Sequence, residues 1–229
     1  MTTNVLIVGA SRGLGLALAE EFNQRPDIHT IAGIRGYPPS SNNIETLRID
    51  ITNPESVSSA ASQITKLDIL VINAGMGEGE KITKISTERL EEYLVTNTLG
   101  THRVLREFLP ALKRGKLKKI IIMSSQSGSM DRQLTLRMGL GGPYGVSKAA
   151  CNMIAVQAHN DLNFGGSEEG EFIVVPLHPG WVATDMGKKV GDGGMSPKVA
   201  GKKLVDLILR LGKEHSGKFI GPDGEVLPW

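Results

Sequence analysis

Tyr144 and Lys148 lie four positions apart, and on a helix this spacing brings a phenol and an ammonium to the same face. A fixed cation beside a phenol favours the phenolate. The hydroxyl of Tyr144 could therefore exchange a proton with a reacting oxygen at neutral pH. A carbonyl group that receives a hydride on its carbon needs such a proton on its oxygen, so the pair suits carbonyl reduction or the reverse oxidation of an alcohol.

Glycines mark the turn that follows the first apolar run of the chain. Residues 5–8 are apolar, and Gly9, Gly13 and Gly15 come directly after them. Glycines at these places allow a tight turn and let the backbone amides at a helix start approach a pyrophosphate. The same pattern occurs in ordinary strand-to-helix connections, so the turn alone leaves both interpretations open.

Arg35 stands where folds that bind NAD usually place an acid. The second apolar run ends at Arg35, and Arg12 lies inside the glycine turn. Both side chains could bind a 2′-phosphate, which predicts NADP(H) in preference to NAD(H). The alternative is that one or both arginines are exposed surface charges.

Short apolar runs alternate with amphipathic segments along the chain. Continuous apolar runs are typical of strands that are covered on both faces, as in a parallel sheet. We therefore expect an α/β fold with a doubly wound, Rossmann-type parallel sheet flanked by helices on both faces, in a single domain over residues 1–229. The predicted strands are residues 5–8, 30–32, 69–72, 120–123 and 172–175.

Helix signals lie between these strands. Asn53 and Ser86 each precede early acidic residues and are expected to cap helix starts. One apolar stripe at helical spacing is formed by Val104, Leu105, Phe108, Leu109 and Leu112.

Two segments interrupt the alternation, residues 129–142 and residues 186–197. Open α/β sheets bind ligands at the carboxyl ends of their strands. We expect both segments there, as loops on the substrate side of the site.

Taken in order, the motifs resemble the short-chain dehydrogenase/reductase family over essentially the whole chain. The glycine turn is similar to the T-G-x-x-x-G-x-G pattern of the family, with Val8 where threonine is usual. Tyr144 and Lys148 match its Y-x-x-x-K motif. The other matches are Asp50 for the acid beside adenine, Asn73-Ala74-Gly75 for the N-N-A-G motif, Asn97 in mid-helix, Ser125, and residues 179–184 for the P-G-x-x-x-T segment.

The resemblance implies roles for four catalytic residues: Asn97, Ser125, Tyr144 and Lys148. Tyr144 would donate the proton and Ser125 would hydrogen-bond the same oxygen. Lys148 would hold the nicotinamide ribose, and the backbone of Asn97 would anchor a water in a proton relay. Contacts with the cofactor are implied for Gly9, Ser11, Arg12, Gly13, Leu14, Gly15, Arg35, Asp50, Ile51, Asn73, Ala74, Gly75, Tyr144, Lys148, Pro179, Gly180, Val182 and Thr184.

Ser125 and Tyr144 are 19 positions apart, a longer spacing than in most of the family. The longer segment is similar to sniffer-type carbonyl reductases and C-factor-like proteins, a branch that fungal ketoreductases share. Its flexible apolar side chains favour a ketone or aldehyde with hydrophobic substituents, while Arg132 offers a partner for an acidic group. The alternative is that these residues pack against the base of their own loop. The residues expected in the substrate wall are Arg132, Leu134, Leu136, Met138 and Leu140.

The leading hypothesis is therefore an NADPH-dependent oxidoreductase that reduces a ketone or an aldehyde. One alternative is a ketoreductase dedicated to a single pathway intermediate, such as an aromatic polyketide. The other is a protein that senses or signals through NADP(H) without turnover.

The overall composition of the chain limits the classes of partner that we expect it to bind. A net charge of +2 and 4% aromatic residues argue against nucleic-acid binding, and no apolar run reaches the roughly 18 residues of a membrane span. Cys151 is the single cysteine, which fits a reducing, cytoplasmic location. We predict a small-molecule carbonyl substrate and no metal site. The resemblance also implies a homodimer or homotetramer.

Overall fold

Six parallel strands form one sheet in the computed structural model, which describes residues 2–36, 44–137, 139–164 and 172–229. Their order across the sheet is β3-β2-β1-β4-β5-β6, and every neighbouring pair is parallel. This order reverses direction at β1, so the predicted doubly wound α/β fold is confirmed. The strands are β1 (Thr3–Val8), β2 (Ile28–Ile34), β3 (Glu45–Arg48), β4 (Ile69–Ile72), β5 (Lys119–Met123) and β6 (Ile173–Leu177).

All five predicted apolar runs contribute to strands, but the edge strand β3 was not predicted. Only Leu47 of its four residues is buried. An edge strand with one covered side chain presents no continuous apolar run, so its sequence, Glu-Thr-Leu-Arg, carried no strand signal.

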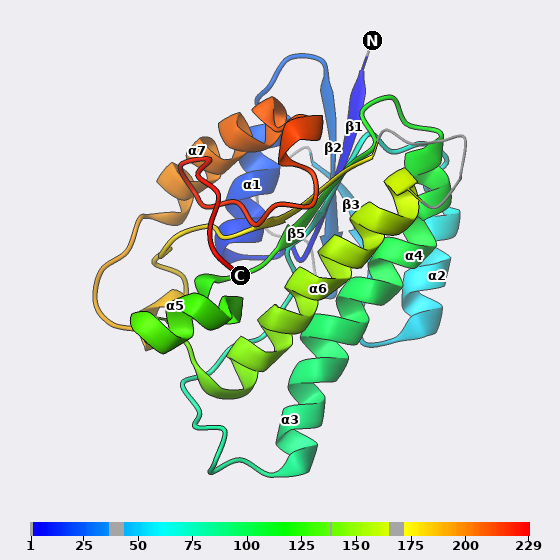
Figure 1. Cartoon of the computed structure of the whole chain (residues 1–229). Coiled ribbons are helices and arrows are strands. Elements are labelled where there is room, and N and C mark those ends of the chain that lie inside the picture. The colour runs from blue at the N-terminus through cyan, green and yellow to red at the C-terminus, as the bar shows by residue number, and fades with distance from the viewer. Residues whose placement is uncertain (1, 37–43, 138, 165–171) are drawn as a thin grey trace.

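Helices cover both faces of the sheet (Figure 1). One core cluster contains Val57, Val104, Phe108 and Cys151, and the other contains Leu18 and Leu204. The first cluster joins the sheet to α2 (Pro54–Ser62), α4 (Gly100–Lys113) and α6 (Gly142–Phe164), and the second joins it to α1 (Gly13–Asn23) and α7 (Pro197–Arg210). The shorter elements are α3 (Thr87–Tyr93), the π-helical η1 (Leu94–Leu99), the 3₁₀ turns η2 (Gln126–Gly128), η3 (Gly187–Lys189) and η4 (Lys213–His215), and α5 (Met130–Thr135).

Both predicted helix caps are confirmed. The side chain of Asn53 accepts hydrogen bonds from the amides of Glu55 and Ser56 at 2.9 and 3.2 Å, and that of Ser86 accepts one from Arg89 at 3.3 Å. These bonds satisfy amides that the first turn of a helix otherwise leaves unpaired.

The apolar stripe of α4 faces the sheet. Val104, Phe108 and Leu112 have no exposed surface, and Leu105 is buried as well. The side chains that the sequence grouped into one stripe are thus used in the core. Among the described residues, no helix combines the length and the apolar composition that crossing a membrane requires.

Candidate active site

The predicted pair lies on the first two turns of α6. The ammonium of Lys148 is 5.7 Å from the centroid of the Tyr144 ring, and both residues are buried, with 5% and 7% of their surface exposed. Lys148 Nζ also donates a hydrogen bond of 2.8 Å to the carbonyl oxygen of Met123, the last residue of β5. The cation is therefore fixed beside the phenol by the end of a central strand.

Ser125 follows β5 by two residues and caps η2, where its Oγ accepts the amide of Ser127 at 3.1 Å. The same turn packs on α6, because a Cβ added to Gly128 would lie 2.6 Å from the carbonyl carbon of Lys148. Among the described residues, the O–H of Ser125 donates to no other group, so it remains available to a ligand oxygen.

Asn97 is completely buried in η1. Its side chain bonds the main chain of Met76 twice, with Oδ1 accepting at 2.8 Å and Nδ2 donating at 2.9 Å, and Nδ2 also donates to Ser147 Oγ at 2.9 Å. Its backbone oxygen accepts bonds from Thr101 Oγ1 at 2.6 Å and Cys151 Sγ at 3.1 Å. Asn97 thus ties the segment after β4 to α6, and the oxygen expected to hold a relay water already has two protein donors.

The side chains of Asn97 and Lys148 both lie beside Gly75. A Cβ on Gly75 would lie 3.1 Å from Asn97 Oδ1 and 3.6 Å from Lys148 Nζ. Three of the four predicted catalytic residues, Tyr144, Lys148 and Asn97, are therefore brought together around the end of β4 and the start of α6. Ser125 lies on the neighbouring turn.

The glycine turn is packed against the end of β4. Gly9 has a φ of +90°, and a Cβ there would lie 2.6 Å from Ala74 Cα. A Cβ on Gly15 would lie 2.0 Å from the oxygen of Gly9, to which Asn73 Nδ2 donates at 3.0 Å. Only glycine fits at these two positions.

The start of α1 can receive an anion. Arg12 precedes the helix and makes no side-chain capping bond, so the first-turn amides stay available to a phosphate. Ser11 is exposed in this turn and Leu14 packs into the core.

Asp50 and Arg35 lie at the ends of β3 and β2. Burial alone would raise the pKa of Asp50. The hydroxyl and amide of Thr52, at 2.7 and 2.9 Å from its Oδ1, and the charge of Arg35 together hold that pKa below its usual range. Asp50 is thus an ionised acceptor beside a guanidinium. Ile51 packs in the core, close to Gly100.

Arg12 pairs with Asp185 in this structure, at 2.5 Å between Nη1 and Oδ2. Both side chains are exposed, by 79% and 72%. An exposed pair of this kind contributes little to stability, so a phosphate could compete with Asp185 for the guanidinium.

The segment after β6 approaches the glycine turn. Pro179 precedes Gly180, which has a φ of +80°. Val182 is buried, and the next amide, that of Ala183, donates to the oxygen of Met195 at 2.8 Å. A Cβ on Gly13 would lie 3.2 Å from Thr184 Cγ2. The two segments, both predicted to contact the cofactor, therefore meet.

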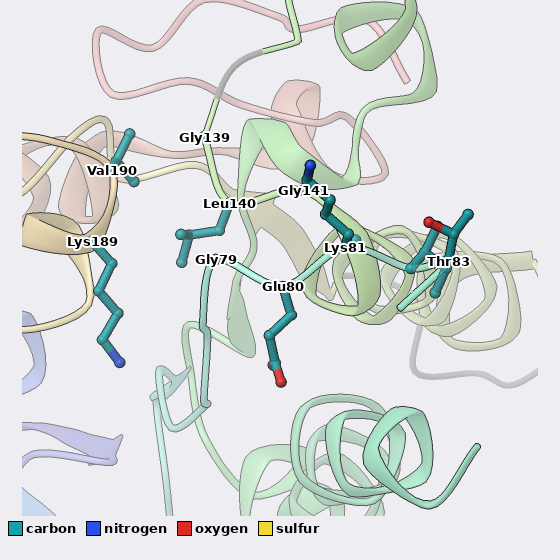
Figure 2. Close-up of a pocket in the computed structure, with 11 residues that line it drawn as sticks. Gly79, Glu80, Lys81, Thr83, Gly139, Leu140, Gly141, Lys189 and Val190 are labelled. Carbon is teal, nitrogen blue, oxygen red and sulfur yellow. The ribbon is translucent and has the colours of Figure 1, made fainter. Parts of the chain in front are cut away.

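An open pocket of about 520 Å³ lies at the start of α6 (Figure 2). Leu140, which packs on Tyr144, is part of its lining. Both predicted substrate-side loops line it, through residues 139–142 and through Lys189 and Val190. A third segment, residues 79–83, also lines it and was not predicted. Two sequence features mark this segment: the alternating glycines Gly75, Gly77 and Gly79, and the charged residues that follow them. Both features are common in loops, so neither indicated a pocket.

The expected substrate wall is only partly formed by the inserted residues. Leu140 is buried against Tyr144 and lines the pocket. Leu134, 82% exposed, and Leu136 point to solvent, and Arg132 bonds the side chain of Gln126 at 3.3 Å. Met138 lies outside the described residues.

The sequence analysis assigned no role to His178. It is buried directly after β6, and its Nδ1 has no hydrogen-bond partner among the described residues. Burial, followed by the charge of Arg132, lowers its pKa to about 4. The imidazole is therefore neutral near pH 7.

A family model described as short chain dehydrogenase matches residues 3–193. An uncharacterized oxidoreductase of Schizosaccharomyces pombe is 29% identical over 98% of this chain and 96% of its own. The 1-hydroxy-2-glutathionyl-2-methyl-3-butene dehydrogenase of a Rhodococcus species is 30% identical over 99% and 100%.

Two solved structures extend the comparison. An NADPH-bound carbonyl reductase from chicken fatty liver has a TM-score of 0.87 at 26% identity and covers 100% of this chain and 99% of its own. The carbonyl reductase Sniffer of Drosophila melanogaster has a TM-score of 0.85 at 28% identity, with both chains fully covered. These likenesses confirm the predicted resemblance to sniffer-type carbonyl reductases, and the chain belongs to the short-chain dehydrogenase family.

Proposed function

We propose that this protein is an NADP(H)-dependent oxidoreductase that reduces a ketone or an aldehyde to an alcohol, with Tyr144 as the general acid. The observation that carries the proposal is the Tyr144–Lys148 pair, buried on α6 beside an open pocket and fixed by the bond from Lys148 to Met123. Burying an ammonium is costly. A tyrosine and a lysine with a purely structural role would therefore require neither the burial of this cation nor a pocket beside it.

NADP(H) is the cofactor. Related solved proteins contain NADPH or NADP, and the residues of this chain fit it. The uncapped start of α1 suits a pyrophosphate, Asp50 offers an ionised acceptor for the adenine, and Arg35 beside it suits a 2′-phosphate. The remaining contacts are proposed for Gly9, Ser11, Arg12, Gly13, Leu14, Gly15, Ile51, Asn73, Ala74, Gly75, Tyr144, Lys148, Pro179, Gly180, Val182 and Thr184.

The bound cofactor supplies or accepts the hydride, and the protein handles the proton. In reduction, Tyr144 donates its hydroxyl proton to the substrate oxygen. Ser125 donates a hydrogen bond to the same oxygen, a contribution of about 3 kcal/mol where such donors have been removed. Lys148 stabilises the phenolate that remains. Asn97 holds the main chain of Met76 and the hydroxyl of Ser147, which keeps the end of β4 against α6.

The substrate is proposed to carry an apolar group next to its carbonyl. Leu140 packs with Tyr144, and Met76 and Met186 pack against the same cluster. Thioether and aliphatic side chains adapt to varied apolar shapes, which favours hydrophobic substituents over small polar ones.

A homo-oligomer is also proposed. On α6, Val146 and Met153 are exposed by 44% and 58%, although most apolar residues of this helix face the core. Light scattering of the purified protein would give the number of subunits. A cytoplasmic location is proposed on the single cysteine, Cys151, which is free and buried.

The test compares the oxidation of NADPH by wild type and Tyr144→Phe with a panel of aldehydes, quinones and diketones. Removing the proton donor should lower kcat by at least about 100-fold and leave NADPH binding, measured by fluorescence, nearly unchanged. Equal turnover by both proteins would exclude Tyr144 as the acid. NADPH binding without turnover on any carbonyl would favour the sensor hypothesis.

A further inference from the structure

Tyr93 is a second buried tyrosine beside the pocket, and the proposed reaction does not use it. It ends α3 and has no exposed surface. Its ring belongs to the same apolar cluster as Leu140 and Tyr144. The phenol of Tyr93 therefore lies behind the residues that line the pocket.

The Tyr93 hydroxyl holds the segment after β4 at two points. It accepts a hydrogen bond from the amide of Glu78 at 3.0 Å and donates a short one to the carboxylate of Glu80. One side chain thus fixes both the main chain and a side chain of the loop whose residues 79–83 line the pocket.

Arg89 completes this network. Its Nε and Nη2 bond the two carboxylate oxygens of Glu80 at 2.9 and 3.1 Å, a fork geometry that fixes direction as well as distance. Its guanidinium also lies 5.1 Å from the centroid of the Tyr93 ring. Figure 2 shows the Glu80 side chain directed away from Leu140 and Gly141, on the far side of the loop from these residues.

The network keeps one protonation state near neutral pH. The hydrogen bonds from Arg89 and Tyr93 lower the pKa of Glu80. Burial and the carboxylate of Glu80 raise the pKa of Tyr93 to about 12. Neither group gains or loses a proton near pH 7, so they are suited to holding structure rather than to moving protons.

The loop they hold touches the catalytic helix at two places. A Cβ on Gly77 would lie 3.0 Å from Tyr144 Cδ2, and a Cβ on Gly142 would lie 2.0 Å from the oxygen of Glu80. Residues 79–83, which begin two positions after Gly77 and include Glu80, form one side of the pocket wall. A displacement of the loop would therefore change the space beside Tyr144.

We propose that Tyr93, Glu80 and Arg89 are positioning residues that set the shape of the substrate pocket by holding residues 77–83 against the start of α6. The proposal rests on the proposed function, because it assigns the pocket to the carbonyl substrate. These residues act on the part of a substrate that extends beyond the carbonyl, whereas Lys148 is held independently of them by its bond to Met123.

The test is Tyr93→Phe, which removes both hydroxyl bonds and keeps the ring. Loss of two hydrogen bonds should raise KM for a bulky aromatic ketone by about tenfold, with kcat changed by less than about threefold. KM for a short aldehyde, too small to touch the wall, should stay the same. A general loss of stability would affect both substrates alike, so an unchanged ratio of the two KM values would overturn the proposal.

Two further variants sharpen the result. Glu80→Gln keeps the shape of the side chain but weakens the bonds from Arg89 and Tyr93. Like Tyr93→Phe, it should raise the ratio of KM for the bulky ketone to KM for the short aldehyde. Glu92→Gln removes the other carboxylate that Arg89 bonds without touching the loop, and it should leave the ratio unchanged.

Hydrogen exchange of the Glu78 amide separates this proposal from the proposed function. If wild type reduces no carbonyl, or if Tyr144→Phe is as active as wild type, the proposed function fails and exchange still tests the network. Tyr93→Phe should speed exchange at residues 77–83 by about tenfold and leave α7 unchanged. Unaltered exchange at Glu78 would overturn the positioning role by itself.

Discussion

The first residue of α6, Gly142, lies directly against the carbonyl oxygen of Glu80. A Cβ at Gly142 would be 2.0 Å from that oxygen, and the φ of Gly142 is +58°. The loop after β4 and the catalytic helix can therefore meet only where α6 begins with glycine. Tyr144 follows two residues later, so this contact also helps to set where the phenol stands.

Gly142→Ala is expected to destabilise the protein. The left-handed backbone of alanine costs about 1–3 kcal/mol, and the clash with Glu80 adds to it, so Tm should fall by roughly 5–10 °C. Differential scanning calorimetry measures the change. Gly79→Ala is the matched control in the same loop, because a Cβ there meets nothing within 4 Å. Similar Tm values for the two variants would contradict the contact.

Lys148→Met keeps most of the side-chain length and removes the charge. Without the cation near Tyr144 and the bond to Met123, kcat/KM for carbonyl reduction should fall by at least about 100-fold. Steady-state kinetics measure it, with Lys202→Met on the exposed side of α7 as the control. If both lysine variants keep wild-type turnover, the buried cation has no role in the reaction.

Arg35→Ala tests the choice of cofactor. Hydrogen bonds to a charged group are worth about 1.5–3 kcal/mol, so the Kd for NADPH should rise by roughly 10- to 100-fold while that for NADH changes little. Fluorescence titration gives both constants. Arg48→Ala, an exposed arginine on the neighbouring β3, serves as the control. A parallel weakening of NADPH and NADH would show that Arg35 does not read the 2′-phosphate.

His178 should make the protein less stable in mild acid. Its pKa is lowered from 6.5 to about 4 in the fold, so the unfolded chain binds the proton first as pH falls. The stability gained from the neutral ring is complete above about pH 6.5 and is lost progressively down to about pH 4, with about 2 kcal/mol already lost at pH 5.

Urea unfolding at about pH 7.5 and about pH 5 measures this loss. In His178→Gln the difference between the two conditions should shrink by about 2 kcal/mol. His102→Gln, on the exposed side of α4, should retain the wild-type difference. Equal pH dependence in wild type and His178→Gln would place the acid sensitivity elsewhere.

The sheet and the contact between Tyr144 and Lys148 could be predicted from the sequence because local patterns carry both. The apolar runs gave five strands, and the spacing of Tyr144 and Lys148 gave a contact that needs only one helix. Gly9 and Gly15 were recognisable because they follow the first apolar run directly and at close spacing. In each case the information lies within a few residues.

What the sequence did not reveal depends on contacts between distant segments. Glu80, Arg89 and Tyr93 form a network only after α3 folds back on the loop that follows β4. Asn97 was expected to act through its backbone, and its side chain also bonds Met76 and Ser147, residues far from it along the chain. Arg12 meets Asp185, 173 positions away. No local pattern marks such partners.

The place of Cys151 turns the single thiol of the chain into a built-in reporter. Its sulfur is buried against the backbone oxygen of Asn97, where a maleimide or a disulfide reagent cannot reach it while α6 is docked on η1. The rate of alkylation therefore counts how often this part of the molecule opens, and a ligand that clamps the two helices together would slow that rate.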